Sequence, residues 1–139
     1  MKIIWTWGPG QVQLPHMPTM LSSGHILIYD NGTEKRPYSR VIELEPVSGH
    51  ILWEYKAKPP ESFFSHWQGS AQRLPNGNTL ICESTKALVF EVTRDGKIVW
   101  RFWSPEVKNT RRKRIYRFMR LPKDKVERNL AKVTHKTGA

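Results

Sequence analysis

An internal repeat is the feature of this sequence that most constrains its fold. The tract 3–7 (IIWTW) recurs as 51–55 (ILWEY) and again as 98–102 (IVWRF), with tryptophans spaced 48 and 47 residues apart. Each later copy follows a turn glycine, Gly49 or Gly96. A repeat period of about 40–50 residues is typical of β-propeller blades, each of which contributes four strands.

The stretches that precede these copies repeat as well. Residues 21–28 (LSSGHILI) align with 74–81 (LPNGNTLI), and residues 41–44 (VIEL) align with 89–92 (VFEV). Alternating apolar and polar residues, with many β-branched and aromatic side chains, indicate strands rather than helices. Asn76-Gly77 provides the positive φ angles that a tight hairpin requires. Each unit therefore predicts four short antiparallel strands.

We predict an all-β fold: a partial β-propeller with two four-stranded antiparallel blades plus one strand of a third, at residues 3–7. Residues 1–103 form the blades, and residues 104–139 form a basic extension with a short helix within 122–133. Because propellers close with about four to eight blades, we expect a fragment of a larger propeller or an assembly of several copies. The alternative is a two-sheet sandwich built from the two repeats.

The side chains that repeat in register suggest where the core lies. Trp5, Trp53 and Trp100 occupy equivalent positions, so we expect them to pack between blades. Cys82 falls within an apolar strand and is expected to be buried rather than reactive. As the one cysteine of the chain, it excludes an internal disulfide and a cysteine-only zinc site.

The positive charge is concentrated in the last quarter of the chain. The net charge is +11, and residues 104–139 hold 12 basic and 3 acidic side chains, against 11 and 9 in residues 1–103. Such a tail can bind nucleic acid or an anionic surface through counterion release, or it can pack against an acidic partner. No nucleic-acid motif accompanies the charge, so nucleic acid is not an expected partner. Apolar residues follow the basic run 111–114, which predicts a segment docked on the domain.

The sequence shows no pattern typical of a targeting signal or of a metal site. No run of 18 apolar residues is present, so we expect no membrane span. The first residues lack the apolar stretch and cleavage site of a secretory signal, and nothing else indicates a location in the cell. We find no zinc spacing, and Asp30 with Asn31 is too small a set for a calcium site, so no metal is expected.

Several tracts together resemble a known family. The tracts 28–32 (IYDNG), 39–43 (SRVIE), 53–55 (WEY) and 74–81 resemble the arylsulfotransferase propeller proteins, over roughly residues 1–120. The resemblance implies transfer of a sulfuryl group from an aryl sulfate to a phenol through a histidine, without a nucleotide sulfate donor or other cofactor. It also implies that full activity requires a closed ring, from further blades or from further copies of the chain. The related enzymes are usually exported.

The resemblance also implies which residues line the central channel. His16 takes a channel-facing position as nucleophile or sulfate ligand, and Arg36 matches the sulfate-binding arginine. His66 is a further channel histidine, and Arg40 and Asn31 are candidate substrate-binding residues. A neutral imidazole can attack sulfur, a second, protonated imidazole can protonate the leaving phenoxide, and arginine forms paired hydrogen bonds to a sulfonate.

Each of these residues also has a purely structural interpretation. His16 can cap a constrained loop between prolines, Arg36 can be solvated, and His66 can belong to an aromatic cluster with its neighbours. His25 and His50 occupy turn positions and are expected to be exposed. The alternative to an enzyme is a non-catalytic propeller-type binding module, since a fold does not determine function. A third hypothesis is an anion binder that acts through its basic tail.

Overall fold

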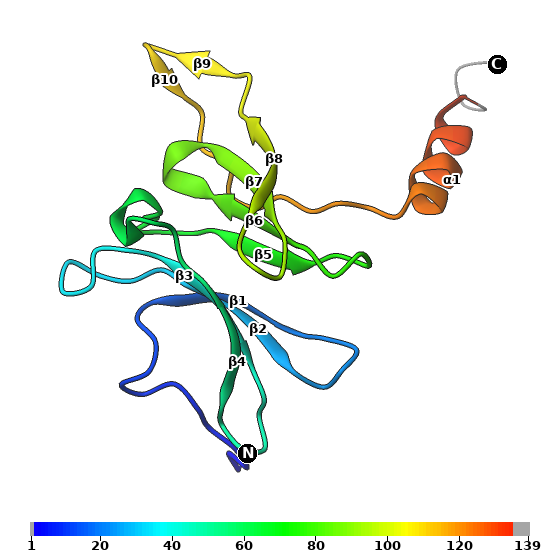
Figure 1. Cartoon of the computed structure of the whole chain (residues 1–139). Helices are drawn as coiled ribbons and strands as arrows, with labels where there is room; N and C mark the ends of the chain where they lie inside the picture. The colour runs from blue at the N-terminus through cyan, green and yellow to red at the C-terminus, as the bar shows by residue number, and fades with distance from the viewer. Residues whose placement is uncertain (1, 135–139) are drawn as a thin grey trace.

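The computed structural model describes residues 2–134, so residues 135–139 of the predicted tail lie outside the described part. Two four-stranded antiparallel sheets dominate it, each with its strands in chain order (Figure 1). The first sheet contains β1 (Pro15–Met20), β2 (Ile26–Asp30), β3 (Arg40–Leu44) and β4 (Ile51–Tyr55). The second contains β5 (Ser70–Arg73), β6 (Thr79–Glu83), β7 (Leu88–Val92) and β8 (Ile98–Trp103). We call these sheets blade 1 and blade 2; they confirm the predicted all-β, propeller-like fold.

The repeat seen in the sequence is reproduced in the backbone of the turns. Gly24 and Gly77 have φ angles of 85° and 84°, a region that glycine adopts without a steric penalty. In both hairpins the N–H of the glycine donates a 2.9 Å hydrogen bond to the carbonyl of the residue three positions earlier, Leu21 or Leu74. Both blades also have a register irregularity between the third and fourth strands, after Glu43 and after Glu91. Equivalent sequences therefore fold into equivalent blades.

The core lies where the two blades meet face to face. Phe63 is 2% exposed and stands between them, with its ring centroid 5.8 Å from Tyr29, 5.8 Å from Tyr55 and 5.5 Å from Phe90. Aromatic rings at these distances add to the stabilisation that burial of their area provides. The surrounding members of this core are Leu27, Val41, Trp53, Ala71, Ile81 and Val92. The interblade contact is thus a continuous hydrophobic core.

A cluster of charges joins the two blades at one edge of this core. Glu43 of β3 accepts hydrogen bonds from Arg73 (2.7 Å) and Arg94 of blade 2, and its Oε1 lies 2.8 Å from Nδ1 of His25. Burial alone would raise the pKa of Glu43, but its hydrogen bonds to His25 and Arg94 outweigh that effect and lower the pKa. The prediction that His25 is an exposed turn residue is wrong, because the contact between its Nδ1 and Glu43 holds the ring against the sheet; His50 is exposed as expected.

Only one of the three repeated tryptophans lies in the interblade core. Trp53 is 8% exposed, and its Nε1 donates a 2.7 Å hydrogen bond to the carbonyl of Arg94 in blade 2. Trp5 is 49% exposed and Trp100 is 38% exposed. The expectation that all three are buried between blades is wrong, because Trp5 and Trp100 have no blade packed over them in the described structure.

The predicted strand of a third blade does not form. Residues 3–7 are not in a β-strand. None of the described residues forms β-sheet hydrogen bonds with their backbone. A strand is stabilised by its hydrogen-bonded neighbour, so an apolar alternating tract without one does not become part of a sheet. The indole nitrogens of Trp5 and Trp7 instead donate hydrogen bonds to Pro46 (3.1 Å) and Gly49 (3.2 Å), in the turn of blade 1.

The faces of the blades that point away from the interblade core are covered by chain segments. Trp7 and Val12 pack on Ile28, Ile42 and Leu44 of blade 1. On blade 2, Ile115 and Phe118 pack on a cluster of Leu74, Leu80, Cys82 and Val89. The prediction that the residues after the basic run dock on the domain is therefore confirmed.

Cys82 is buried in this second cluster, as predicted. It is 1% exposed, and burial raises the pKa of its thiol to about 12. Its thiol donates a 3.4 Å hydrogen bond to the carbonyl of Ile115. A protonated, covered thiol of this kind is chemically inert at neutral pH.

The basic extension contains a hairpin and a helix. The short strands β9 (Val107–Lys108) and β10 (Arg111–Arg112) pair with each other, an element that the sequence patterns did not predict. The helix α1 (Lys123–Thr134) confirms the predicted one. Two single-turn helices, Pro60–Ser62 and Ser84–Lys86, complete the described structure. No described helix is long and apolar enough to cross a membrane.

Candidate functional site

Two consecutive buried residues, Asp30 and Asn31, organise the candidate site. They stand at the end of β2, and both are 0% exposed. Buried polar side chains are stable only when hydrogen bonds satisfy them, and each of these two makes several. Asp30 binds two arginines, and Asn31 binds a histidine and a loop of blade 2. This dipeptide therefore contacts His16, Arg36, Arg40 and the loop that carries His66.

Asn31 joins blade 1 to the loop that precedes β5. Its Nδ2 donates 2.6 Å hydrogen bonds to the carbonyls of Ser65 and Gln68, and its Oδ1 lies 2.7 Å from Nδ1 of His16. Two carbonyl acceptors on the same nitrogen fix the orientation of the amide, so the atom facing His16 is an oxygen. The Asn31 side chain therefore has no donor left for a substrate; its role in this arrangement is to hold its neighbours in place.

His16 lies in β1 where that strand departs from regular pairing. The register with β2 shifts between His16 and Thr19, and Leu14 and Met17 on either side have φ angles of 52° and 50°. The Nδ1 atom of His16 faces two acceptors, the Asn31 Oδ1 and the carbonyl of Leu14 at 3.1 Å. Because both neighbours of Nδ1 are hydrogen-bond acceptors, Nδ1 is the nitrogen that carries the proton in the neutral ring. The lone pair of the neutral ring is therefore on Nε2.

Arg36 and Arg40 both bind Asp30. Nη2 of Arg36 lies 2.5 Å from Oδ1, and Nε of Arg40 lies 2.8 Å from Oδ2. Arg40 also pairs with Glu54 at 2.8 Å and donates to the carbonyl of Gln11 at 2.6 Å. Burial alone would lower the pKa of Arg40, but the hydrogen bonds to Asp30 and Glu54 outweigh that effect and raise the pKa. Asp30 thus holds both guanidiniums beside the end of β2.

Arg36 keeps more free hydrogen-bonding capacity than Arg40. Besides its bond to Asp30, it donates a 3.0 Å hydrogen bond from Nη1 to the carbonyl of Tyr38, and its guanidinium lies 4.9 Å from the Tyr38 ring centroid. A guanidinium has five N–H donors, so Arg36 retains donors that no described residue accepts. The interpretation of Arg36 as a freely solvated loop residue does not fit these contacts.

His66 lies in the loop that Asn31 holds. The hydrogen bonds to Ser65 and Gln68 flank it, and its ring lies 4.1 Å from the ring of Phe64 at 46°. The His66 side chain is exposed, with no hydrogen bond to any described residue. Asn31 therefore anchors the backbone of the loop on both sides of His66, while the imidazole is exposed and packs on Phe64.

Several residues that position this loop were not singled out from the sequence. The Ser39 hydroxyl donates to the carbonyl of Asn31 (2.7 Å) and accepts the N–H of Ser65 (2.9 Å). Gly69 has a φ of 114°, and a Cβ there would lie 2.5 Å from Cζ of Tyr29. A glycine directly before the first strand of blade 2 was the available signal, since glycine marks close approach of the backbone to another group.

A buried tyrosine and a buried glutamate lie beneath the loop. The Tyr29 hydroxyl is buried and has no hydrogen-bond partner among the described residues. The Ser39 and Ser65 hydroxyls lie near it. Burial raises the pKa of Tyr29 well above its usual value, and the charge of Glu83 adds to the effect. Burial also raises the pKa of Glu83, whose Oε1 accepts the N–H of Phe64 at 3.0 Å.

No metal site is formed by the part of the chain that the structure describes. None of its groups of histidine, cysteine, aspartate and glutamate side chains has the three members that would hold an ion. The oxygens of Asp30 and Asn31 bind arginine and histidine partners instead. What the arrangement offers chemically is an oriented imidazole, a second accessible imidazole and two fixed cations.

Comparison with known proteins places the chain in a family. No curated protein and no solved structure matches the chain significantly. The family model of arylsulfotransferase (ASST) matches residues 14–105. The matched region begins just before β1, ends just after β8, and includes Asp30 and the five candidate residues His16, Asn31, Arg36, Arg40 and His66. The chain, with its two blades and the residues gathered between them, belongs to the arylsulfotransferase family.

Proposed function

We propose that this chain carries part of a sulfuryl-transfer site in which His16 is the nucleophile. The observation that supports the proposal is the arrangement at Asp30 and Asn31, which collects two arginines, His16 and the His66 loop on consecutive residues. The donor is an aryl sulfate and the acceptor a phenol, as the family implies. A nucleophile, an acid and a cationic clamp are the groups that such a transfer requires.

The proposed reaction has two steps on sulfur. The lone pair of His16 Nε2 attacks the sulfur of the aryl sulfate, the bond from sulfur to the aryl oxygen breaks, and the leaving phenoxide takes a proton from His66. In the second step the oxygen of the acceptor phenol attacks the same sulfur. The bond between sulfur and Nε2 then breaks, the phenol proton passes to His66, and both histidines return to their starting states.

Arg36 and Arg40 are proposed to bind the sulfonate oxygens. Charge that builds up on these oxygens is stabilised best by donors that are already in place. Asp30 provides that fixation, since it holds both guanidiniums from one buried carboxylate. Arg36 is the stronger candidate, because Arg40 directs more of its donors to protein acceptors.

A non-catalytic binding module is the second candidate function. The observation that favours it is the pairing of both arginines with Asp30, which neutralises part of the charge that a sulfonate would use. Such a module would bind a ligand or a protein partner without breaking a bond.

The first test combines the mass of the chain in solution with an assay of turnover. Light scattering measures the number of copies, and a chromogenic aryl sulfate reports phenol release. We expect a discrete oligomer that releases phenol, because a channel site needs more than two blades to enclose it. A monomer that releases no phenol would contradict sulfuryl transfer by this chain as it stands.

Asn31 is proposed as a positioning residue that fixes the tautomer of His16. Nitrogen NMR of the imidazole distinguishes a protonated Nδ1 from a protonated Nε2, and we expect Nδ1–H in the wild-type chain because both neighbours of Nδ1 are acceptors. Replacement Asn31→Ala removes one acceptor, so the Nε2–H tautomer should increase. It should also destabilise the fold by about 1–3 kcal/mol, since two buried carbonyls lose their donor.

The replacement Ser39→Ala serves as the control for this measurement. It removes a hydroxyl that also anchors the Ser65 loop but does not contact His16. We expect a similar loss of stability with no change in the His16 nitrogen signals. Equal signals in wild type and Asn31→Ala would show that Asn31 does not set the tautomer.

A further inference from the structure

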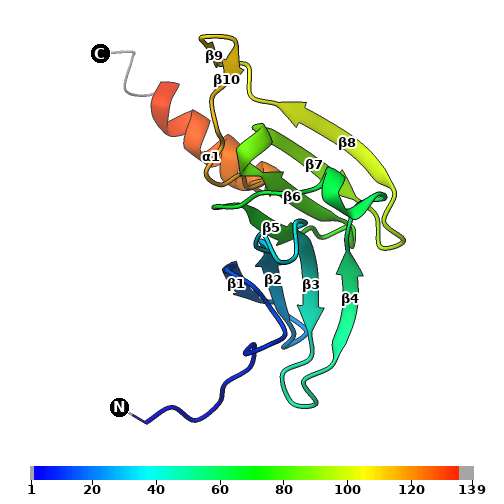
Figure 2. The same cartoon turned by 90° about the vertical axis from the view of Figure 1, so that its left-hand side faces the viewer.

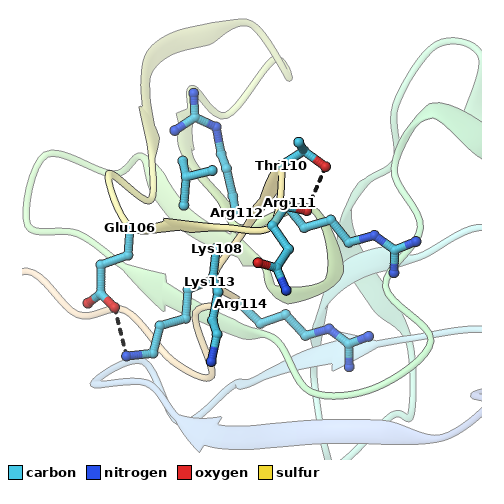
Figure 3. Close-up of a pocket in the computed structure, with 9 residues that line it drawn as sticks. Glu106, Lys108, Thr110, Arg111, Arg112, Lys113 and Arg114 are labelled. Atoms are coloured by element: carbon cyan, nitrogen blue, oxygen red, sulfur yellow. Dashed lines mark hydrogen bonds and ion pairs between the residues drawn. The ribbon is translucent and has the colours of Figure 1, made fainter.

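The β9–β10 hairpin and the residues beside it expose cations that pair with no carboxylate of the described residues. Residues 106–114 line an open hollow (Figure 3), where Lys113 pairs with Glu106 at 2.7 Å and Arg112 donates to the carbonyl of Ser104 at 2.7 Å. Lys108, Arg111 and Arg114 form no ion pair with any residue in the described range 2–134. Figure 3 shows the side chains of Arg111 and Arg114 extending toward the same side of the hairpin.

Large apolar side chains are exposed along the same stretch of chain. Val107 is 57% exposed, Tyr116 66% and Leu121 46%. Val107 is four residues from Arg111, Tyr116 is two from Arg114, and Leu121 is four from the exposed Arg117, so this stretch of chain carries exposed charge and exposed apolar side chains together. Exposed apolar groups rimmed by polar ones are typical of interaction sites.

Helix α1 continues this pattern beyond the hairpin. Val126 and Leu130, which are 38% and 60% exposed, are four residues apart and therefore lie on one side of the helix. Lys123 and Arg128 form ion pairs within the helix, with Glu127 and Asp124, and Lys125 forms none among the described residues. Figures 1 and 2 both place the hairpin and α1 on the blade 2 end of the molecule, away from the N-terminus.

We propose that residues 107–130 form a surface that docks on an anionic lipid bilayer. Lysine and arginine side chains near a membrane are attracted to acidic headgroups, and apolar side chains between them enter the boundary with the acyl chains. A nucleic-acid backbone would use the cations as well, but it would leave Val107, Leu121 and Val126 without an apolar partner. The combination on this surface therefore favours the bilayer. This inference goes beyond the sulfuryl-transfer site and does not depend on it.

The test is co-sedimentation of the full chain with lipid vesicles. Vesicles of phosphatidylcholine with about a third phosphatidylserine should bind the chain, and vesicles of phosphatidylcholine alone should not. Binding should weaken as salt rises from about 0.05 M to about 0.5 M, because salt screens exposed charges. The double variant Arg111→Ala/Arg114→Ala should bind about thirtyfold more weakly, at about fivefold for each cation.

Two further double variants test the place of the charge and the contribution of the apolar side chains. Lys35→Ala/Lys97→Ala removes two exposed cations of the blades, and it should bind as wild type. Val107→Ser/Leu121→Ser should weaken binding to anionic vesicles while its salt dependence stays unchanged. Circular dichroism checks that each variant is folded.

Three results would overturn the proposal. Equal binding to both kinds of vesicle would remove the electrostatic part of the argument. If the Arg111/Arg114 and Lys35/Lys97 double variants lost vesicle binding to the same extent, the net charge of the chain and not residues 107–130 would account for binding. Binding to a nucleic-acid duplex but not to vesicles, unaffected by Val107→Ser/Leu121→Ser, would assign the surface to nucleic acid instead.

Discussion

Replacing His16 with alanine should reduce phenol release from an aryl sulfate by about a thousandfold or more, as removal of a nucleophile does in other covalent catalysts. The physical reason is the free Nε2 lone pair, which the contacts of Nδ1 with Asn31 and Leu14 leave available for attack on sulfur. Mass spectrometry after incubation with the aryl sulfate should find one sulfuryl group on the wild-type chain and none on His16→Ala.

The control for this prediction is His50→Ala. His50 is exposed in the turn before β4, and it should behave as wild type in both measurements. Binding of an aryl sulfate that is equal in wild type and His16→Ala, with no phenol release from either, would support the binding module. Phenol release that survives in His16→Ala would show that another residue is the nucleophile.

Replacing Phe63 with alanine should lower the free energy of unfolding by about 3–5 kcal/mol, the usual cost of removing a buried aromatic ring. Phe63 contacts rings of both blades, so the cavity would open in the middle of the interblade core. Urea unfolding followed by tryptophan fluorescence measures the change. Phe63→Leu keeps most of the volume and should cost about 1.5 kcal/mol, which provides a measurable variant if the alanine variant does not fold.

Phe64→Ala is the matched control, since it removes the same ring from the next position. Phe64 is only half-buried and contacts His66 rather than the interblade core. Its replacement should cost about 1 kcal/mol. Equal costs at the two positions would mean that the interblade aromatic cluster does not hold the blades together.

The strands and turns of both blades are predictable because their signals are local. Short apolar runs along β2 and β6, each bounded by turn residues, are typical of strands that are buried on both faces, and a glycine with positive φ sets each hairpin. The repeat then assigns the same structure to both units. The same local argument fails at residues 3–7, where the pattern of a strand is present but no neighbouring strand in the described structure pairs with it.

The candidate residues of the site were named from the sequence and stay a prediction, and the sequence did not predict how they are arranged. Resemblance to the family singled out His16, Arg36, Arg40, Asn31 and His66. It did not predict that Asp30 would bind both arginines, or that Asn31 would use its whole amide to hold His16 and the Ser65–Gln68 loop. Those hydrogen bonds depend on where the loops come to lie, which no local pattern specifies.

The sequence by itself therefore determined the blades, their turns, the basic extension and the family, since each depends on neighbouring residues or on a repeat. Only the tertiary structure decided which tryptophan is buried, how the blade faces are covered and what Asn31 holds. The acceptors of Asn31 lie 34 and 37 residues further along the chain. Contacts over such separations form only when two blades pack face to face, because that packing brings the end of β2 against the loop before β5.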